Sequence, residues 1–476
     1  MSALRLTVGW LAAAVAGRIV SGDPDQVVGN VVTDSRSLEA GDFFVALRGP
    51  RFDGHAFVDD VIARGAMGAL IDGVGRGFTP RQAGREGPPY TDPAIVEVGD
   101  TTKALQDLAH AVREAVATRV VAITGSAGKT TTKDTIADFL SASLRVVKNK
   151  GNLNNHIGLP LSLMQLRAKP DVAVMELGMN HVGEISTLVA IADPDVRVWT
   201  NVGDAHLGFF DSPDAIADAK AEILEGAEPH DVLVCNADDT LVMTRAAGFA
   251  GRTITFGESD RATVRARDIE DRGIDGTRAR VVAPAGECLI ETPLLGRGNL
   301  SNVLAATAVA LEFGVSLSTI ASRAAALRPA DRRGAVHRLH GGITLIDDSY
   351  NSSPAALRRA LDVIAKEGRA SRKVAVLGEM LELGDHATAL HQDSGRMAAS
   401  AGLRLLFAVG GAPARALADA AIASGMSHAS VIYFEKSEEA ASAIAAALRS
   451  GDLVLVKGSR GTRTDLIADR IAAEFA

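Results

Sequence analysis

The chain has 476 residues, too many for one hydrophobic core, and this length suggests about three domains. Its composition, 47% hydrophobic and 23% charged, is ordinary for a soluble globular protein. A formal net charge of −8 without any run of Lys or Arg argues against a nucleic-acid-binding surface, so we expect no nucleic-acid partner. The two cysteines, Cys235 and Cys288, are too few for a disulfide framework or a zinc site.

The N-terminal stretch fits two interpretations. Arg5 followed by the apolar residues 6–16 is similar to a secretory signal, whereas Trp10 to Val15 also fits an amphipathic helix that stops at Gly17. We favour the helix, because the phosphate-binding motif described below needs a compartment that holds ATP. We therefore expect a cytoplasmic protein, and because no run of about 18 apolar residues occurs, we expect no membrane insertion.

Residues 1–99 form the first expected α/β domain. The pattern predicts strands at 41–47, 69–72 and 94–98 and a helix at 55–64. Residues 73–93 are rich in Gly, Pro and Arg and are expected to form a surface loop. Two polar clusters stand out, residues 33–36 and 51–55. Taken alone, each is more often turn chemistry than a binding site.

The next stretch of the chain predicts a phosphate-binding loop. An apolar strand at 120–123 leads into a glycine turn at 124–128, and a helix begins at Lys129 and continues to about residue 140. Amide groups at such a turn and the positive end of the helix face an anion, to which Lys129 adds a charge. Thr130 offers a hydroxyl to a magnesium ion that bridges phosphates.

The loop departs from the general pattern G-x-x-x-x-G-K-[ST] at one position, where Ile123 replaces the first glycine. What stands is Thr-Gly-x-x-Gly-Lys-Thr. The alternative is a glycine turn that joins a strand to a helix and binds nothing. Few such turns place Lys-Thr at the helix start directly after a Val/Ile run, so we interpret the loop as a nucleotide-phosphate site.

From residue 100 onward, strands alternate with helices, which indicates a parallel sheet. The strands expected in a central domain, 100–327, are 120–124, 171–176, 196–202 and 231–235. After a linker near residue 328, the same alternation predicts a smaller, Rossmann-like C-terminal domain, 328–476. Its expected strands are 343–347, 373–377, 404–409, 431–434 and 453–456. The fold class we expect is therefore α/β, with three domains.

Functional residues collect just past the carboxyl ends of parallel strands. In the central domain these places hold the glycine turn, Glu176, residues 201–206 and residues 236–239. An acid such as Glu176 helps to hold magnesium beside a phosphate loop, and His206 suggests a second metal. Lys220 lies on a predicted helix, where spacing alone favours a solvated lysine.

Several polar motifs are spread over the chain. They are Thr124–Lys133, Asn152–Pro160, Glu176–Gly178, Asn201–His206, Asp218–Ile223, Asn299–Asn302 and Lys457–Gly461. Together they resemble the Mur ligases of bacterial peptidoglycan synthesis, which carry the short form of the phosphate loop. Asp347–Pro354 and Leu377–Asp385 resemble the members of this family that add D-alanyl-D-alanine, and the Asp-Asn-Pro-Arg signature expected of the diaminopimelate- or lysine-adding members is absent.

The resemblance implies an ATP-dependent amide ligase. The carboxylate of UDP-N-acetylmuramoyl-tripeptide would attack the γ-phosphate of ATP to give an acyl phosphate, from which the amine of D-alanyl-D-alanine would displace phosphate. The first domain would bind the UDP moiety, the central domain ATP, and the C-terminal domain would complete the ATP site and bind the dipeptide. The resemblance also implies two Mg²⁺ ions and a carbamylated Lys220, and we expect a monomer whose domains close on ligand binding.

The resemblance assigns site residues by motif position. The catalytic residues would be Lys129, Glu176, His206, Lys220 and Arg333. The residues that contact ATP would be Thr124, Gly125, Ser126, Ala127, Gly128, Lys129, Thr130, Thr131, Asn299, Asn302, Arg333, Asp348 and Asn351. The metal ligands would be Thr130, Glu176, His206 and Lys220. The UDP moiety would meet Ser35, Arg36, Asp53, Gly54 and His55.

Two positions depart from the family pattern. Gly298 stands where the family usually has His before Asn299, and Ser352-Ser353 replaces the more usual Ala-Asn before Pro354. The first departure weakens the assignment of Asn299 to the adenine. The second is small and leaves the predicted substrate unchanged.

Three alternatives compete with this interpretation: a sibling ligase that adds the third residue, a folylpolyglutamate-synthase-like enzyme, and an ATP-driven switch or assembly protein. The folate enzyme begins near its phosphate loop, whereas here about 120 residues precede the loop. A switch needs neither His206, nor Lys220, nor the stretch 347–354. We therefore favour the D-alanyl-D-alanine-adding ligase.

Overall fold

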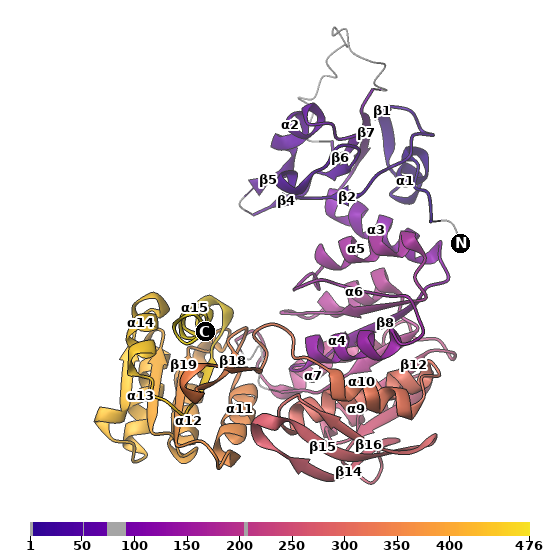
Figure 1. Cartoon of the computed structure of the whole chain (residues 1–476). Coiled ribbons are helices and arrows are strands. Elements are labelled where there is room, and N and C mark those ends of the chain that lie inside the picture. The colour runs from indigo at the N-terminus through magenta and orange to yellow at the C-terminus, as the bar shows by residue number, and fades with distance from the viewer. Residues whose placement is uncertain (1–2, 51, 74–91, 204–207) are drawn as a thin grey trace. The chain divides into compact units, whose positions relative to one another are not determined.

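The structure is a computed structural model, which describes residues 3–50, 52–73, 92–203 and 208–476 (Figure 1). The chain forms two compact units. The first comprises Met1–Ala122, Leu144–Met179 and Gly183–Val196, and the second comprises Ile123–Ser143, Asn180–Val182 and Arg197–Ala476. Within the described ranges, no helix combines the length and the apolarity that crossing a membrane would require.

The N-terminal part of the first unit is built on a five-stranded sheet in the order β1-β7-β6-β3-β2. The strands are β1 Arg18–Ser21, β2 Val31–Val32, β3 Phe43–Val45, β6 Gly68–Asp72 and β7 Ala94–Val98, and a separate hairpin pairs β4 Arg48–Gly49 with β5 Phe52–Asp53. Strands β2, β3, β6 and β7 run parallel, and β1 is antiparallel to β7. The three strands predicted for this region are confirmed, the first of them as the shorter β3.

Three helices accompany this sheet: α1 Val8–Ala14, α2 Val58–Ala63 and α3 Thr101–Glu114. Helix α1 begins after Thr7, whose side chain accepts a hydrogen bond from the Trp10 amide, and it buries Val8 and Leu11. The helical interpretation of the N-terminal stretch is therefore confirmed. Of the predicted helix at 55–64, the first turn is a 3-10 helix, Gly54–Phe57, and the rest is α2. The predicted surface loop lies outside the described residues except at its two ends.

The central sheet has nine strands in the order β16-β15-β14-β13-β12-β11-β8-β10-β9. Their bounds are β8 Arg119–Thr124, β9 Val146–Lys148, β10 Val172–Glu176, β11 Val196–Trp199, β12 Val232–Asn236, β13 Arg252–Gly257, β14 Val264–Asp271, β15 Thr277–Ala283 and β16 Gly286–Thr292. The four predicted central strands are confirmed as β8, β10, β11 and β12. The accompanying helices are α4 Lys129–Leu140, α5 Gly158–Leu163, α6 Glu184–Ala192, α7 Pro213–Ala221, α8 Thr240–Ala246, α9 Gly296–Glu312 and α10 Leu317–Ala326.

This sheet is mixed, so the expectation of a parallel sheet does not hold at one edge. Strands β9 and β10 are parallel, as are β12, β13 and β14, but β14, β15 and β16 form an antiparallel meander. The meander exposes one face, where Arg280 pairs with Glu287 and Arg278 with Glu291 at 3.2 Å each. Charged residues that alternate with apolar ones are typical of such half-exposed antiparallel strands.

The C-terminal part of the second unit is a six-stranded sheet in the order β17-β18-β22-β19-β20-β21. Its strands are β17 Ala335–Arg338, β18 Thr344–Asp348, β19 Arg372–Gly378, β20 Leu405–Val409, β21 Val431–Phe434 and β22 Asp452–Lys457. Its helices are α11 Pro354–Lys366, α12 Ala387–Ser400, α13 Ala412–Ala423, α14 Ser437–Ala447 and α15 Asp465–Glu474. All five predicted strands are confirmed and run parallel, and the unpredicted β17 is antiparallel to β18.

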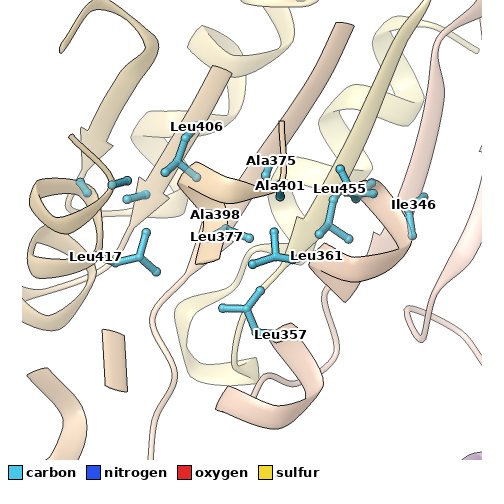
Figure 2. Packing of buried hydrophobic residues seen from close by; sticks show 14 of the residues in the cluster. Ile346, Leu357, Leu361, Ala375, Leu377, Ala398, Ala401, Leu406, Leu417 and Leu455 are labelled. Atoms are coloured by element: carbon cyan, nitrogen blue, oxygen red, sulfur yellow. The ribbon is translucent and has the colours of Figure 1, made fainter. Parts of the chain in front are cut away.

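Alternate side chains of these strands enter two separate cores, one on each face of the sheet. In the core of Figure 2, Leu357 and Leu361 of α11 share a buried cluster with Leu377 of β19 and Leu455 of β22. Because parallel strands are covered on both faces, they appear in the sequence as continuous apolar runs.

A buried histidine of α12 holds the loop that follows β19. His391 has no exposed surface, and its Nε2 accepts a hydrogen bond from the Met380 amide at 2.9 Å. Its Nδ1 lies 2.7 Å from the carbonyl oxygen of Ala387, so Nδ1 carries the proton. Burial lowers the pKa of His391, an effect that the Ala387 carbonyl and the charge of Glu379 oppose. The ring is therefore neutral in the folded protein.

We expect the stability of the protein to fall as the pH drops below the ordinary histidine pKa of 6.5, and His391→Gln to remove part of this slope. Below that value the unfolded chain binds a proton that the folded protein binds only at lower pH, so the free energy of unfolding is constant above the window and decreases within it. Urea unfolding between about pH 8 and pH 5 measures the slope. His428→Gln, at an exposed histidine, is the control; equal slopes in His391→Gln and the wild type would contradict the prediction.

Candidate active site

The phosphate-binding loop requires both of its glycines. Gly125, after β8, has φ of +149°, and Gly128, before α4, has φ of +83°, values that favour glycine. A Cβ on Gly125 would lie 1.9 Å from Thr200 Oγ1, and one on Gly128 would lie 2.1 Å from Asn302 Oδ1. Neighbouring side chains therefore pack directly against the loop backbone.

Asn201, after β11, fixes the loop by hydrogen bonds in both directions. Its Oδ1 accepts from the Ala127 amide and its Nδ2 donates to the Ala127 carbonyl, each at 2.9 Å, while its own carbonyl accepts from the Ser126 amide at 3.0 Å. The amides of Ser126 and Ala127 are thus engaged within the protein. An anion at this loop would meet the beginning of α4 instead, where the helix end carries partial positive charge.

Two lysines lie close together beside this loop. Lys129 Nζ donates to the Gly125 carbonyl at 2.7 Å. Lys220 of α7 is only 1% exposed, and among the described residues its ammonium has no hydrogen-bond or ion-pair partner. Burial, and then the charge of Lys129, hold the pKa of Lys220 well below its ordinary value. Lys220 is therefore a buried amine that favours its neutral, nucleophilic form, not the solvated lysine that spacing alone suggested.

Glu176 ends β10 and belongs to the first unit. It is buried, and Asn154 Nδ2 donates to its Oε1 at 3.0 Å. Asn149 holds the backbone of Glu176, accepting from its amide at 3.1 Å and donating to its carbonyl at 3.3 Å. The motif Asn152–Pro160 thus supplies a residue that orients this carboxylate. The sequence alone does not indicate that Asn154 orients Glu176, because the two residues become neighbours only in the folded protein.

The donor chemistry at these positions suits magnesium. Thr130 and Glu176 offer oxygen, which Mg²⁺ prefers, and Lys220 would offer oxygen only as a carbamate. In the described ranges, no group of three or more His, Cys, Asp or Glu side chains is arranged to hold a metal. The predicted ligand His206 lies outside the described residues.

The two asparagines predicted to contact the adenine lie in the first two turns of α9. Asn302 is 6% exposed, accepts a hydrogen bond from Thr132 Oγ1 at 3.3 Å, and donates to Asn299 Oδ1 at 3.1 Å. Asn299 Nδ2 in turn donates to the Leu295 carbonyl at 2.9 Å. Asn302 therefore packs against the phosphate loop at Gly128 and the first turn of α4, a role that only the folded structure reveals.

The polar residues predicted for the C-terminal domain lie together at the ends of β18 and β22. Lys457, which is 3% exposed, donates to Asp348 Oδ2 at 2.7 Å and to the Asn351 carbonyl at 2.9 Å. The guanidinium of Arg333 lies 4.1 Å from the ring centroid of Tyr350. Lys457 belongs to the motif Lys457–Gly461, for which the sequence predicts no specific role. Its two hydrogen bonds connect the end of β22 to the residues that follow β18.

The residues predicted for the UDP moiety make local contacts in the N-terminal sheet region. His55 Nδ1 donates to Asp53 Oδ1 at 2.6 Å, and His55 Nε2 accepts from the Asp72 amide at 3.0 Å. Asp53 also accepts from the His55 amide, and a Cβ on Gly54 would lie 2.7 Å from the Leu47 carbonyl oxygen. The structure shows that this cluster makes turn contacts, and its role toward a ligand stays a prediction.

The cluster around Ser35 and Arg36 is also a turn. Asp34 caps the 3-10 helix Ser35–Ser37 and forms a two-point ion pair with Arg36, which lowers the pKa of Asp34 to about 2. The Ser35 carbonyl accepts from Arg64 at 2.6 Å. The exposed Arg36 stays a predicted contact to the UDP moiety.

Comparison with known proteins extends over the chain. Profiles described as the Mur ligase family catalytic domain, the Mur ligase middle domain, and the Mur ligase glutamate ligase domain match residues 27–113, 123–310 and 332–460. The UDP-N-acetylmuramoyl-tripeptide--D-alanyl-D-alanine ligase of Bacillus subtilis is 33% identical over 466 residues, which cover 98% of each chain.

Solved structures agree with these matches. A crystal structure of MurF from Acinetobacter baumannii has a TM-score of 0.84 at 32% identity and covers 99% of this chain and 100% of that one. The MurF ligase from Thermotoga maritima in complex with ADP has a TM-score of 0.77 at 28% identity over 94% of this chain and 97% of that one. The phosphate loop and the α/β sheets define the class of the protein, an α/β protein with a nucleotide-binding phosphate loop. The chain belongs to the Mur ligase family.

Proposed function

We propose that this protein is the ATP-dependent ligase that adds D-alanyl-D-alanine to UDP-N-acetylmuramoyl-tripeptide through an acyl phosphate. The observation that carries the proposal is the end-to-end similarity to ligases of this one activity, together with a phosphate loop of the Mur type. The tripeptide carboxylate attacks the γ-phosphorus, and the bond to ADP breaks. The dipeptide amine then attacks the acyl carbon, losing a proton as phosphate leaves and the amide forms. The product is the pentapeptide precursor of peptidoglycan.

The residues of the central domain position and neutralise charge in this reaction. Lys129 and the beginning of α4 bind the β- and γ-phosphates, and this raises the electrophilicity of the γ-phosphorus. Thr130 and Glu176 would hold Mg²⁺, which supplies charge neutralisation at the phosphates, and by motif position His206 would hold a second ion. Asn149 and Asn154 keep the Glu176 carboxylate in place.

Lys220 becomes a carbamate in this proposal. Its neutral amine attacks CO₂, a C–N bond forms, and one proton is released, so that the buried amine becomes an anionic oxygen donor. The burial of Lys220 without a described partner and its lowered pKa support this step, because only a neutral amine is a nucleophile. The carbamate would face the positive charge of Lys129.

The remaining roles follow the three proposed domains, 1–99, 100–327 and 328–476. The first binds the UDP moiety with the clusters at 33–36 and 51–55, and the last contributes Arg333, Asp348 and Asn351 to the ATP site and binds the dipeptide. We further propose that the enzyme is cytoplasmic, because its cosubstrate ATP is present in the cytoplasm. We also propose that it acts as a monomer.

The decisive experiment supplies ATP, Mg²⁺, UDP-N-acetylmuramoyl-tripeptide and D-alanyl-D-alanine and follows the product by mass. We expect a pentapeptide, with ADP and phosphate in equal amounts. A parallel reaction with the UDP-dipeptide and diaminopimelate or lysine tests the sibling activity and should give no product. A folded protein that binds ADP but makes no pentapeptide would overturn the proposal.

A further inference from the structure

An arginine of the C-terminal domain occupies the space beside a glycine at the beginning of α9. A Cβ on Gly298 would lie 2.8 Å from Cδ and 3.1 Å from Nε of Arg359, which belongs to α11. One turn further along α11, Val363 approaches Gly296 in the same way, at 3.1 Å. The two glycines of α9 thus let α11 pack closely, and the side chain of Arg359 crosses the position that a residue larger than glycine would fill.

This first turn of α9 is joined directly to the phosphate loop. Asn302, four residues after Gly298, packs against Gly128 and Thr132. Four residues of α-helix span about 6 Å, so Arg359 lies roughly one helical turn beyond the residue that supports the loop. A nucleotide whose phosphates lie at the loop would have its nucleoside portion within reach of this turn.

The charge of Arg359 has no partner within the described part of the chain, where it makes neither a hydrogen bond nor an ion pair. Asp348 is near enough to favour the charged form, but that carboxylate bonds to Lys457 at 2.7 Å. By contrast, Arg332 in the same domain is paired with Asp465 and Asp469 at 2.6 and 3.0 Å. The side chain of Arg359 is exposed to solvent, so its guanidinium is charged and accessible to a ligand.

We infer that Arg359 is a nucleotide-binding residue, whose planar guanidinium packs on the nucleoside portion of ATP. The inference rests on the proposed use of ATP and adds a residue that no motif indicated. A guanidinium stacks on an aromatic face as well as carrying charge, which suits a purine held at the end of α9. The same packing explains why residue 298 is a glycine, because a larger side chain at this position would displace Arg359.

The test measures the binding of ADP and of inorganic tripolyphosphate by calorimetry to the full-length wild type, Arg359→Ala and Arg359→Lys. We expect Arg359→Ala to weaken ADP binding about tenfold and leave tripolyphosphate binding unchanged, with Lys restoring only part of the loss. Arg358→Ala, which removes the same charge from the next position of α11, is the matched control and should bind both ligands like the wild type.

Unchanged ADP binding by Arg359→Ala would overturn the inference, as would an equal loss for both ligands, which would mean a purely electrostatic effect on the phosphates. If the wild type itself bound no ADP, the proposed function would fail instead. Gly298→His tests the packing separately. It should weaken ADP binding and lower the melting temperature, and Arg359→Ala in the same chain should restore the melting temperature; no recovery would count against the contact.

Discussion

Lys220→Ala is expected to lower the ligation rate by about 10²–10³-fold, the cost of removing one charge that stabilises the transition state. The fold should survive, because the substitution removes a buried polar head group that has no partner among the described residues. Deleting such a group relieves a desolvation penalty, so the melting temperature should stay equal to that of the wild type or rise. Steady-state kinetics and thermal melts of the same preparations measure both effects.

Chemical rescue separates a carbamate from a simple packing role. A short carboxylate such as acetate can occupy the space of the deleted side chain and should restore part of the activity of Lys220→Ala. With ¹³C-bicarbonate, the wild type should show a carbamate carbon signal that the variant lacks. Lys103→Ala, at an exposed lysine paired with Asp107, is the control and should change none of these readouts. Full activity of Lys220→Ala, or a carbamate signal that survives the substitution, would contradict the role.

The strands that could be predicted from the sequence are those buried on both faces. β8, β10 and β12 and the five parallel strands of the C-terminal domain have continuous Val-, Ile- and Leu-rich stretches, and such runs report strands without knowledge of their neighbours. The meander of β14, β15 and β16 was missed because its strands are half exposed and rich in Arg and Glu. Its cross-strand ion pairs exist only once the strands are paired.

The same distinction applies to the site. The phosphate loop is local, so the spacing of its glycines and of Lys129 predicts it directly. The residues that hold it are distant in sequence: Asn201 bonds to the loop backbone, and Asn302 packs beneath it. Their contacts depend on which strands and helices become neighbours, which a linear pattern does not contain. The burial of Lys220 is likewise a tertiary property, and spacing alone pointed to the opposite interpretation.

Gly128→Ala should weaken nucleotide binding strongly and destabilise the fold. A residue with a side chain in the left-handed region costs about 1–2 kcal/mol. The new Cβ would also lie 2.1 Å from Asn302 Oδ1, so Asn302 must move away from Thr132 and Asn299. Leaving these buried polar groups unsatisfied adds about 1–3 kcal/mol. Together the two terms correspond to a fall of several degrees in melting temperature, and the displaced loop should bind ADP at least about a hundredfold more weakly.

Gly314, which follows the C-terminal end of α9, allows the backbone strain of a substitution to be measured without a steric clash. Gly314 has φ of +79°, nearly that of Gly128, but a Cβ there would meet no atom within 4 Å. Gly314→Ala should therefore show the conformational cost alone, with normal ADP affinity. Adding Asn302→Ala to Gly128→Ala removes the atoms that collide, so the double variant should be less destabilised than the sum of the two single changes. If Gly128→Ala matched Gly314→Ala in both stability and ADP binding, close packing of Asn302 under the loop would not be what requires glycine at this position.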